Sequence, residues 1–462
     1  MAKGKRRFKF WHFLVCVVLL GAAGGGVFEW FSVRQAERAI AVEVTKLRAL
    51  GIATSPDEMP KPGPDDRNAA LIYQEAIRLR RALNLKKPTE TSFGKPDLDY
   101  PTKLALYIKE FQPVLDLVKQ AAALPDCSFR RDWSQGMNVL FPEFSELKEF
   151  VKAAMDKSNA EADRGNFTES FAWLRVGRQI AAHVREPTLI SHLVSVAGES
   201  IVDRALQTQM RSHYAKPQFL EFARKFCEES IPLPSPRGSF SGEVLLVRTS
   251  LADIASGKTA IKELSGMVTG QSDGEMPSFD KLTIQALRVP SVRKEVERKL
   301  LARYRTMVEQ MPTDPTQFEG LETATLDIDN EIRRDQSTSG KLASFFTPIF
   351  SSAGVTTASI VAKRRITRQG LEIFAYKVKT GFWPKSIDAS KPWAIDPFTK
   401  KPFIYKLMPD GFGLYSIGSN RRDDQGAPQY EYPKGRPGPV DDIAFFRPRT
   451  PPKPHVGVRA AP

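Results

Sequence analysis

Apolar residues form one uninterrupted run near the start of the chain and recur at helical spacing through most of the remainder. The run, FWHFLVCVVLLGAAGGGVF, extends from Phe10 to Phe28 without a charged residue. Beyond it, apolar residues recur every three or four positions as far as Gly51, which is typical of an amphipathic helix with a glycine stop. The residues in this pattern are Val33, Ala36, Ile40, Val44 and Leu47.

The uncharged run predicts a membrane-spanning helix. Nineteen residues at about 1.5 Å each come close to crossing a hydrocarbon core of about 30 Å. The five basic residues before the run place the N-terminus in the cytoplasm by the positive-inside rule; they are Lys3, Lys5, Arg6, Arg7 and Lys9. We therefore expect a cytoplasmic leader at 1–9 and a transmembrane helix at 10–30 in contact with the lipid bilayer. This organisation is that of a single-pass protein of the inner membrane whose bulk is exported.

A cleaved signal peptide is the alternative interpretation of the same segment. A basic start, an apolar centre and the small residues Gly21, Ala22 and Ala23 also fit that template. The apolar character continues beyond this possible cleavage point, which favours the anchor. Both interpretations predict that most of the protein is exported.

The sequence beyond residue 30 predicts a mainly α-helical protein with an irregular antiparallel helical domain at 31–230. We expect one helix capped by Asp65 or Asp66, a second one centred on residues 104–122, and three more at Phe144–Ser158, Phe167–Val184 and Pro187–Met210. Three prolines and two glycines at 231–242 predict a linker.

A second helical region with loops is expected at 243–354. Its helices lie near Glu243–Ala255 and Pro290–Gln310, and Ser265–Ser278 is a loop rich in glycine and serine. Ser337–Gly354 combines four large apolar residues with Ser, Thr and Gly. This composition predicts a loop folded onto the core, with a lid or a second membrane contact as alternatives.

The last part, 355–446, predicts a small α+β cap. A helix at Val355–Thr380 precedes strands at Phe403–Leu407 and Phe412–Ile417, and the turn residues Pro409 to Gly411 join these strands into a β-hairpin. The tail at 447–462 lacks apolar periodicity and is expected to be disordered.

Several blocks of this cap carry a family resemblance. TGFWP, DPFTKKPFIYK, DGFGLYSIGSNRRDD and a final DDI follow a helix containing Tyr376. In this order they resemble the C-terminal module of type II secretion major pseudopilins, and also membrane-anchored helical proteins of planctomycete-like bacteria. The N-terminus lacks the cleaved leader and glutamate of a pilin, so the resemblance is confined to the module.

The resemblance implies a calcium site in the loops that follow the hairpin. The ligands implied are Asn420, Asp423, Asp424, Asp441 and Asp442. Hard oxygen ligands on adjoining loops suit Ca²⁺, and Asp423 and Asp442 are expected to approach one another. The segment Gln425–Val440 is longer than the family loop. No other cofactor is expected.

The net charge of +15 does not predict a nucleic-acid site. The leader and the tail hold nine of the basic residues, which leaves about +6 spread over the body. An anionic membrane surface or another envelope component is the more natural neighbour. The three cysteines form no disulfide framework, although one Cys127–Cys227 bridge is possible in an oxidising compartment.

Three further patterns are typical of catalytic or metal sites. Ser272 lies in a G-x-S-x-G match with loop-like flanks, and Gly257–Thr259 partly matches a phosphate loop. His183 and His192 lie near Glu186 and Glu199, but hydrogen-bonded core histidines are the better interpretation. The sequence thus predicts a binding or assembly (scaffold) component of the cell envelope, with an exported hydrolase or a pilus-associated subunit as alternatives.

Overall fold

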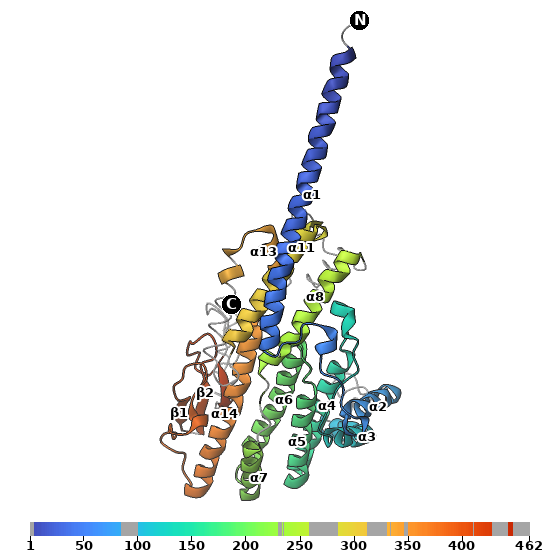
Figure 1. Ribbon diagram of the computed structural model, residues 1–462. Coiled ribbons are helices and arrows are strands. Elements are labelled where there is room, and N and C mark those ends of the chain that lie inside the picture. Colours follow the sequence, from blue (N-terminus) through green and yellow to red (C-terminus); the bar gives the residue numbers. More distant parts are fainter. Residues whose placement is uncertain are drawn as a thin grey trace, which may run out of the picture.

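Helices make up most of the chain, and a small antiparallel sheet of three strands lies near its C-terminus (Figure 1). The computed structural model describes residues 4–84, 100–229, 233, 235–257, 285–311, 330–332, 334–345, 350–409, 411–426 and 442–446. The predicted mainly helical class is confirmed. The Ser265–Ser278 loop and the tail at 447–462 lie outside the described residues.

The elements follow one another along the chain with few long interruptions. The helices are α1 (Gly4–Ala49), α2 (Ala69–Leu83), α3 (Tyr100–Ala122), α4 (Pro142–Asp163), α5 (Phe167–His183), α6 (Leu189–His213), α7 (Pro217–Glu228), α8 (Phe240–Ser256), α11 (Pro290–Gln310), α13 (Thr338–Phe345) and α14 (Phe350–Thr380). The strands are β1 (Ile404–Met408), β2 (Gly411–Ser416) and β3 (Ile443–Phe446).

Helix α1 has two halves with different surroundings. Its first half projects from the body, whereas its second half lies along α11 and buries Ala36, Ile40, Val44 and Leu47 (Figure 1). The amphipathic pattern that begins at Val33 therefore belongs to the packed half. Gly51 adopts a φ of 78°, a conformation that favours glycine and that ends the helix where the sequence predicts.

The remaining helices enclose one continuous core. α4 packs against α5, both pack against α6, and α6 packs against α14. The buried apolar cluster extends from Ile40 in α1 to Phe445 in β3. It includes residues before and after 231–242, so this segment connects elements of the same core.

Two predicted helix starts are wrong because side chains of neighbouring residues supply the caps. The N-cap of α2 is Asn68, not Asp65 or Asp66, since its Oδ1 accepts from Ala70 N at 3.1 Å and from Ser128 N at 2.9 Å. The N-cap of α6 is Thr188, so Pro187 lies outside the helix. The Pro187 carbonyl instead accepts from Gly242 N at 2.6 Å, and a Cβ on Gly242 would lie 2.3 Å from that oxygen.

Two segments expected to be irregular contain helix. In the predicted linker, Pro236–Ser239 form a 3₁₀ turn and α8 begins at Phe240, whose ring is fully buried. In the loop predicted at Ser337–Gly354, α13 and the start of α14 are helical, and Leu342 and Ala343 are buried. Burial of these apolar residues stabilises helix in sequences with weak helical propensity.

The hairpin predicted near the C-terminus is confirmed, and a third strand joins it. β1 pairs with β2 from Ile404–Tyr415 to Met408–Gly411, and β2 pairs with β3 on its other edge, both antiparallel. One face of the sheet packs on α14 through aromatic rings. Phe412 lies 5.7 Å from Phe374 of α14 and 5.2 Å from Trp383, measured between ring centroids.

Candidate functional site

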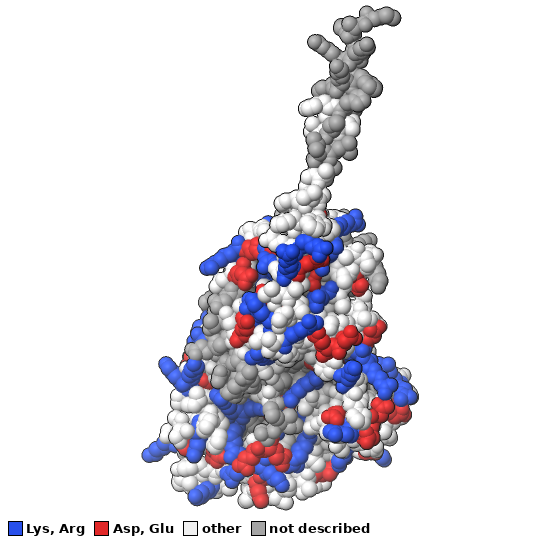
Figure 2. Space-filling view, viewed as in Figure 1, with Lys and Arg blue, Asp and Glu red and all other residues white. Residues whose placement is uncertain are grey.

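The projecting half of α1 exposes large apolar side chains. Their exposed fractions run from 42% at Leu14 to 72% at Phe28. This set consists of Phe13, Leu14, Val15, Val17, Val27, Phe28, Trp30 and Phe31. Below it, Figure 2 shows charged side chains of both signs over the body. An apolar surface of this kind marks a site of contact with a partner or a membrane.

The base of the projecting half is fixed firmly to the body. The Glu29 carboxylate accepts hydrogen bonds from Ser291 N at 2.7 Å and Ser291 Oγ at 2.6 Å, at the N-terminus of α11. A carboxylate is stabilised there by the unpaired amides and by the helix dipole. Near this base, the Arg34 guanidinium lies 5.7 Å from the centre of the Trp30 ring. Further along α1, the Glu43 carboxylate accepts a hydrogen bond from Arg305 Nε of α11 at 2.6 Å. These contacts attach α1 to α11 at Glu29 and Glu43.

The length of apolar helix bears directly on the predicted anchor. In the part of the chain that the structure describes, no helix has an apolar stretch long enough to cross a membrane.

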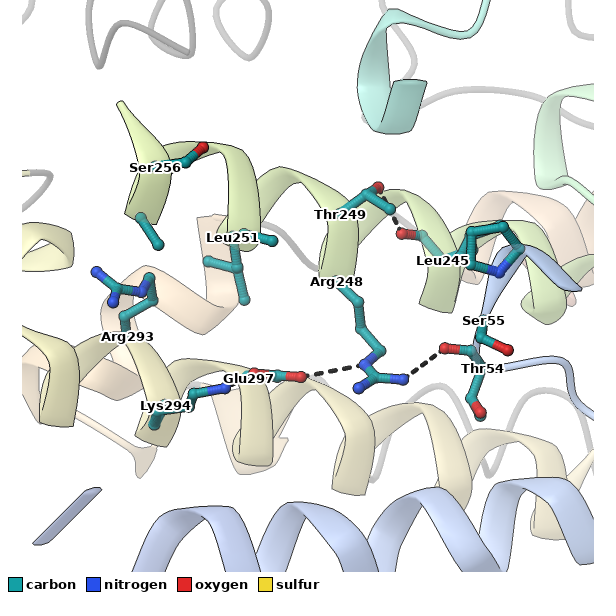
Figure 3. A pocket seen from close by; sticks show the side chains of 13 residues that line it. Thr54, Ser55, Leu245, Arg248, Thr249, Leu251, Ser256, Arg293, Lys294 and Glu297 are labelled. Atoms are coloured by element: carbon teal, nitrogen blue, oxygen red, sulfur yellow. Dashed lines mark hydrogen bonds and ion pairs between the residues drawn. The ribbon is translucent and has the colours of Figure 1, made fainter. Parts of the chain in front are cut away.

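A hollow of about 630 Å³ opens between α8, α11 and residues 54–56 (Figure 3). One wall is apolar and comes from Leu245 and Leu251 of α8. On the opposite side, Glu297 accepts from Arg248 Nε at 3.1 Å and from Lys294 Nζ at 3.2 Å, while Arg248 Nη1 donates to the Thr54 carbonyl. The cations thus already have partners, and their arrangement joins α8, α11 and the loop after α1.

A group of charged side chains around the fully buried Glu199 lies where α5, α6 and α14 meet. Glu199 of α6 has no exposed surface, and its carboxylate accepts from Arg364 Nη2 at 2.6 Å. Arg178 Nε lies 3.9 Å and Arg185 Nη2 3.6 Å from the same carboxylate. One turn later, Asp203 is also buried. This buried charge cluster, Arg178, Arg185, Glu199, Asp203 and Arg364, ties α14 to the helices before it.

Burial makes Asp203 of this cluster sensitive to pH. Desolvation raises the pKa of its carboxyl to about 6, against the opposing effect of Arg364 and Arg178. Because the folded protein binds this proton more tightly than the unfolded chain, the stability contributed by the neutral carboxyl is present below pH 4. It is lost as the pH rises through about 6.

We expect Asp203→Asn to remove this pH dependence, because the amide has the shape of the neutral acid and does not ionise. At about 1.4 kcal/mol per pH unit between the ordinary pKa and about 6, the variant should be ~2–3 kcal/mol more stable than the wild type at pH 7. Near pH 4 the two should be equal. Urea unfolding at both pH values measures the difference, and a variant that is less stable at pH 7 contradicts the expectation.

The two histidines considered as metal ligands are instead hydrogen-bonded in the core, as predicted. His183 Nδ1 lies 3.0 Å from Tyr73 Oη and its Nε2 lies 3.1 Å from the Leu124 carbonyl. The same Nε2 also lies 2.8 Å from Gln179 Nε2. His192 Nε2 lies 2.8 Å from Thr357 Oγ1. Burial lowers the pKa of both imidazoles to about 4, which keeps them neutral at pH 7.

Arg131 is the centre of a second buried charge group, beside a cavity of about 1000 Å³. Its guanidinium donates to the carboxylates of Glu143 and Glu186 and lies over the rings of Phe141 and Phe144. Cys127 also lines the cavity. Burial raises its thiol pKa to about 12, so the thiol is not an activated nucleophile.

The loops after the hairpin hold most of the carboxylates implied as calcium ligands. Asp423 accepts from Tyr415 Oη at 3.0 Å, and Asp424 accepts from Arg422 Nε at 3.1 Å and from Asn420 Nδ2 at 3.0 Å. Asp442 accepts from Gly426 N at 2.7 Å. Burial, together with the nearby Asp424 and Asp423 carboxylates, raises the Asp442 pKa to about 6, against the opposing effect of hydrogen bonds from the backbone of Gly426 and Asp424.

These contacts do not yet make a metal centre. Among the described residues, no group of three or more His, Cys, Asp or Glu side chains is arranged to hold a metal ion. Arg422 and Asn420 already occupy the oxygens of Asp424, whereas Asp442 Oδ1 is buried with no hydrogen-bond partner among the described residues. Asp441 lies outside the described residues. Calcium binding at this loop stays a prediction.

The other chemical motifs are placed only in part. Ser272 and residues 258–259 lie outside the described residues. Gly257 is the C-cap of α8 with a φ of 72°, so the partial phosphate-loop match ends a helix and does not open one. Cys127 and Cys227 are both free, and the disulfide considered between them is not formed.

Comparison of the chain with protein-family models, with curated proteins and with solved structures gives no match.

Proposed function

We propose that this chain is a membrane-anchored scaffold of the cell envelope, held by residues 10–30 and exposing its body on the non-cytoplasmic side. The observation that carries the proposal is the exposed apolar half of α1, from Phe13 to Phe31. At roughly 25 cal/mol per Å² of apolar surface, leaving such side chains in water is costly, and a lipid phase removes that cost.

The details of this helix favour a bilayer over a protein groove as its surroundings. Its exposed apolar side chains are spread along both ends of the projecting half, and a Cβ added at Gly24, Gly25 or Gly26 would meet no other part of the described chain within 4 Å. Trp30 and Arg34 lie where the helix joins the body, and aromatic and basic residues are common at the membrane interface. The basic residues at positions 3–9 support a cytoplasmic N-terminus.

The body supports a role in assembly. Glu199 is already paired with Arg364, and Arg131 with Glu186, while the neutral histidines are hydrogen-bonded to neighbouring elements. These groups serve to join helices rigidly. The C-terminal sheet on α14 supports the proposed likeness to a pseudopilin module, which would add an envelope-protein contact at that end.

We expect Val17→Asp to release the protein from the membrane fraction. Val17 is 50% exposed near the centre of the apolar run, where a carboxylate costs about 2.5–3.5 kcal/mol in a bilayer. Val42→Asp is the matched control, because Val42 is 51% exposed on the packed half of the same helix. The measurement is the share of protein that resists an alkaline carbonate wash of isolated membranes.

The proposal predicts that wild type and Val42→Asp stay in the pellet and that Val17→Asp moves largely to the supernatant. A reporter enzyme fused after Pro462 should be active only outside the cytoplasm. A wild-type protein that is washed off, or a reporter active only in the cytoplasm, contradicts the proposal.

A further inference from the structure

The first turn of α11 lies beside the point where α1 leaves the body (Figure 1). Glu29 of α1 accepts from Ser291 N of α11. Further along, Glu43 accepts from Arg305 Nε, with the same sequence separation between the partners. The two helices therefore run parallel, and the N-terminal end of α11 points in the same direction as the projecting half of α1. With residues 10–30 in a bilayer, the first turn of α11 lies at the depth of Glu29, in the headgroup layer.

Three guanidinium groups lie at this end of the body, and none has a carboxylate at ion-pair distance among the described residues. Arg288 is exposed in the turn before α11. Arg293 reaches back to the same turn, because its Nη1 donates to the Leu287 carbonyl at 3.0 Å. Arg34 reaches back along α1, since its guanidinium lies 5.7 Å from the centre of the Trp30 ring. The contacts thus hold the three positive charges near the depth at which α1 leaves the body.

The acidic groups of α1 and α11 near these arginines leave an excess of positive charge. Glu29 offsets one charge, although both of its oxygens already accept from Ser291. Both oxygens of Glu295 accept from Arg298, at 2.6 and 2.8 Å. Glu37 is exposed, but it lies about 12 Å beyond Glu29 along α1, on the side away from the projecting half. The three arginines therefore attract anions to this end of the body.

The turn before α11 also exposes an apolar side chain. Val289 is 42% exposed, and its neighbours Arg288 and Pro290 are exposed as well. The turn is fixed to the helix, because the Val289 carbonyl accepts from Arg293 N at 3.0 Å. An apolar side chain between cationic groups, level with the exposed Trp30 of α1, is the combination found on surfaces that lie in a membrane interface.

We propose that this membrane-proximal surface, formed by Arg34, Arg288, Val289 and Arg293, binds the phosphate groups of anionic lipids in the bilayer that holds residues 10–30. Guanidinium groups bind phosphate oxygens through paired charge-assisted hydrogen bonds, and Val289 enters the layer beneath the headgroups. The body then rests on the bilayer and does not stand away from it. The inference deepens the proposed function and rests on it for the bilayer at residues 10–30.

The test is photo-cross-linking of the full chain to tritiated phospholipid in reconstituted vesicles. The photoreactive residue p-benzoylphenylalanine replaces Val289 or, as the matched control, Val42, which is 51% exposed on α1 about 20 Å beyond Glu29. In phosphatidylcholine vesicles with about 30% phosphatidylglycerol, we expect at least fivefold more labelled lipid at position 289 than at position 42. The yield at 289 should fall in phosphatidylcholine alone, and also when salt is raised from about 50 to about 500 mM.

Charge reversal identifies the groups responsible. Arg288→Glu and Arg34→Glu should each lower the yield at position 289 about fivefold in the anionic vesicles. Lys385→Glu makes the same charge change at an exposed lysine beyond α14 and should leave the yield unchanged. Equal yields at 289 and 42, a yield independent of anionic lipid, or no effect of either arginine variant overturns the inference.

An alkaline carbonate wash of the same vesicles separates this inference from the proposed anchor. Protein that resists the wash but is labelled equally at positions 289 and 42 contradicts the lipid contact and leaves the anchor standing. Protein that is washed off yet labelled selectively at 289 contradicts the anchor and supports the lipid contact. Protein that is washed off and not labelled selectively contradicts both.

Discussion

Replacing Glu199 with alanine is expected to lower the free energy of unfolding by about 3–5 kcal/mol. The Glu199 carboxylate is fully buried and lies within 4 Å of the guanidinium groups of Arg178, Arg185 and Arg364. Its removal leaves these cations close together in the core with Asp203 as the remaining buried carboxylate of the cluster. Breaking a buried ion pair from one side costs far more than the pair contributes in net stability, because the remaining charge cannot regain its hydration.

Urea unfolding of the detergent-solubilised chain measures this loss. Glu75→Ala is the control, since Glu75 forms an ion pair with Arg78 on the surface and its side chain is 53% exposed. Exposed pairs contribute about 0–1 kcal/mol, so the control should unfold almost like the wild type. If Glu199→Ala costs no more than the control, the buried charge cluster does not hold α14 against α5 and α6.

Replacing Arg131 with alanine is expected to cost a similar ~3–5 kcal/mol. The guanidinium pairs with two buried carboxylates, Glu143 and Glu186, and lies 4.2 Å from the centre of the Phe141 ring. Burial already raises the pKa of Glu186, and Arg131 opposes that increase. Without Arg131 the pKa of Glu186 rises further, so the variant should lose less stability at pH 4, where the carboxyl is protonated, than at pH 7.

The adjacent Arg130→Ala supplies the comparison for this second variant. Arg130 pairs with Asp65 at 3.0 Å, but its side chain is 71% exposed, so its loss should change stability by less than about 1 kcal/mol at either pH. Thermal unfolding of both variants at pH 4 and pH 7 gives the result. An Arg131→Ala protein with the same loss at both pH values would show that ring packing, and not charge, accounts for its effect.

The sequence predicts the helices well because their apolar periodicity is local information. The helix expected at Pro290–Gln310 has the same bounds as α11, and the glycine stop at Gly51 is where α1 ends. The starts of α2 and α6 depend on contacts with distant segments, at Asn68 with Ser128 and at Pro187 with Gly242. Such contacts leave no local pattern. β3 is not predicted from the sequence, because its four residues, IAFF, do not alternate between apolar and polar side chains.

The candidate sites are harder to predict for the same reason. Arg131, Glu199 and Asp203 are charged residues in helical or loop sequence, where solvent exposure is the ordinary expectation. One available indication was that Glu199 and Asp203 interrupt the apolar residues of the predicted helix at Pro187–Met210. A pocket beside α14 is lined by residues of α7, of α14 and of the loop that follows it, and only the folded chain brings these segments together.

The unbroken backbone of α1 fixes how far and in which orientation the body can stand from a surface. The helix has 46 residues, or about 69 Å at the usual rise, and Glu29 and Glu43 attach its second half to α11. Because the helix is continuous from Gly4 to Ala49, the direction of its free end and the orientation of the body are coupled. A surface that holds the free end therefore limits the directions in which the small sheet, at the remote end of the body, can face (Figure 1).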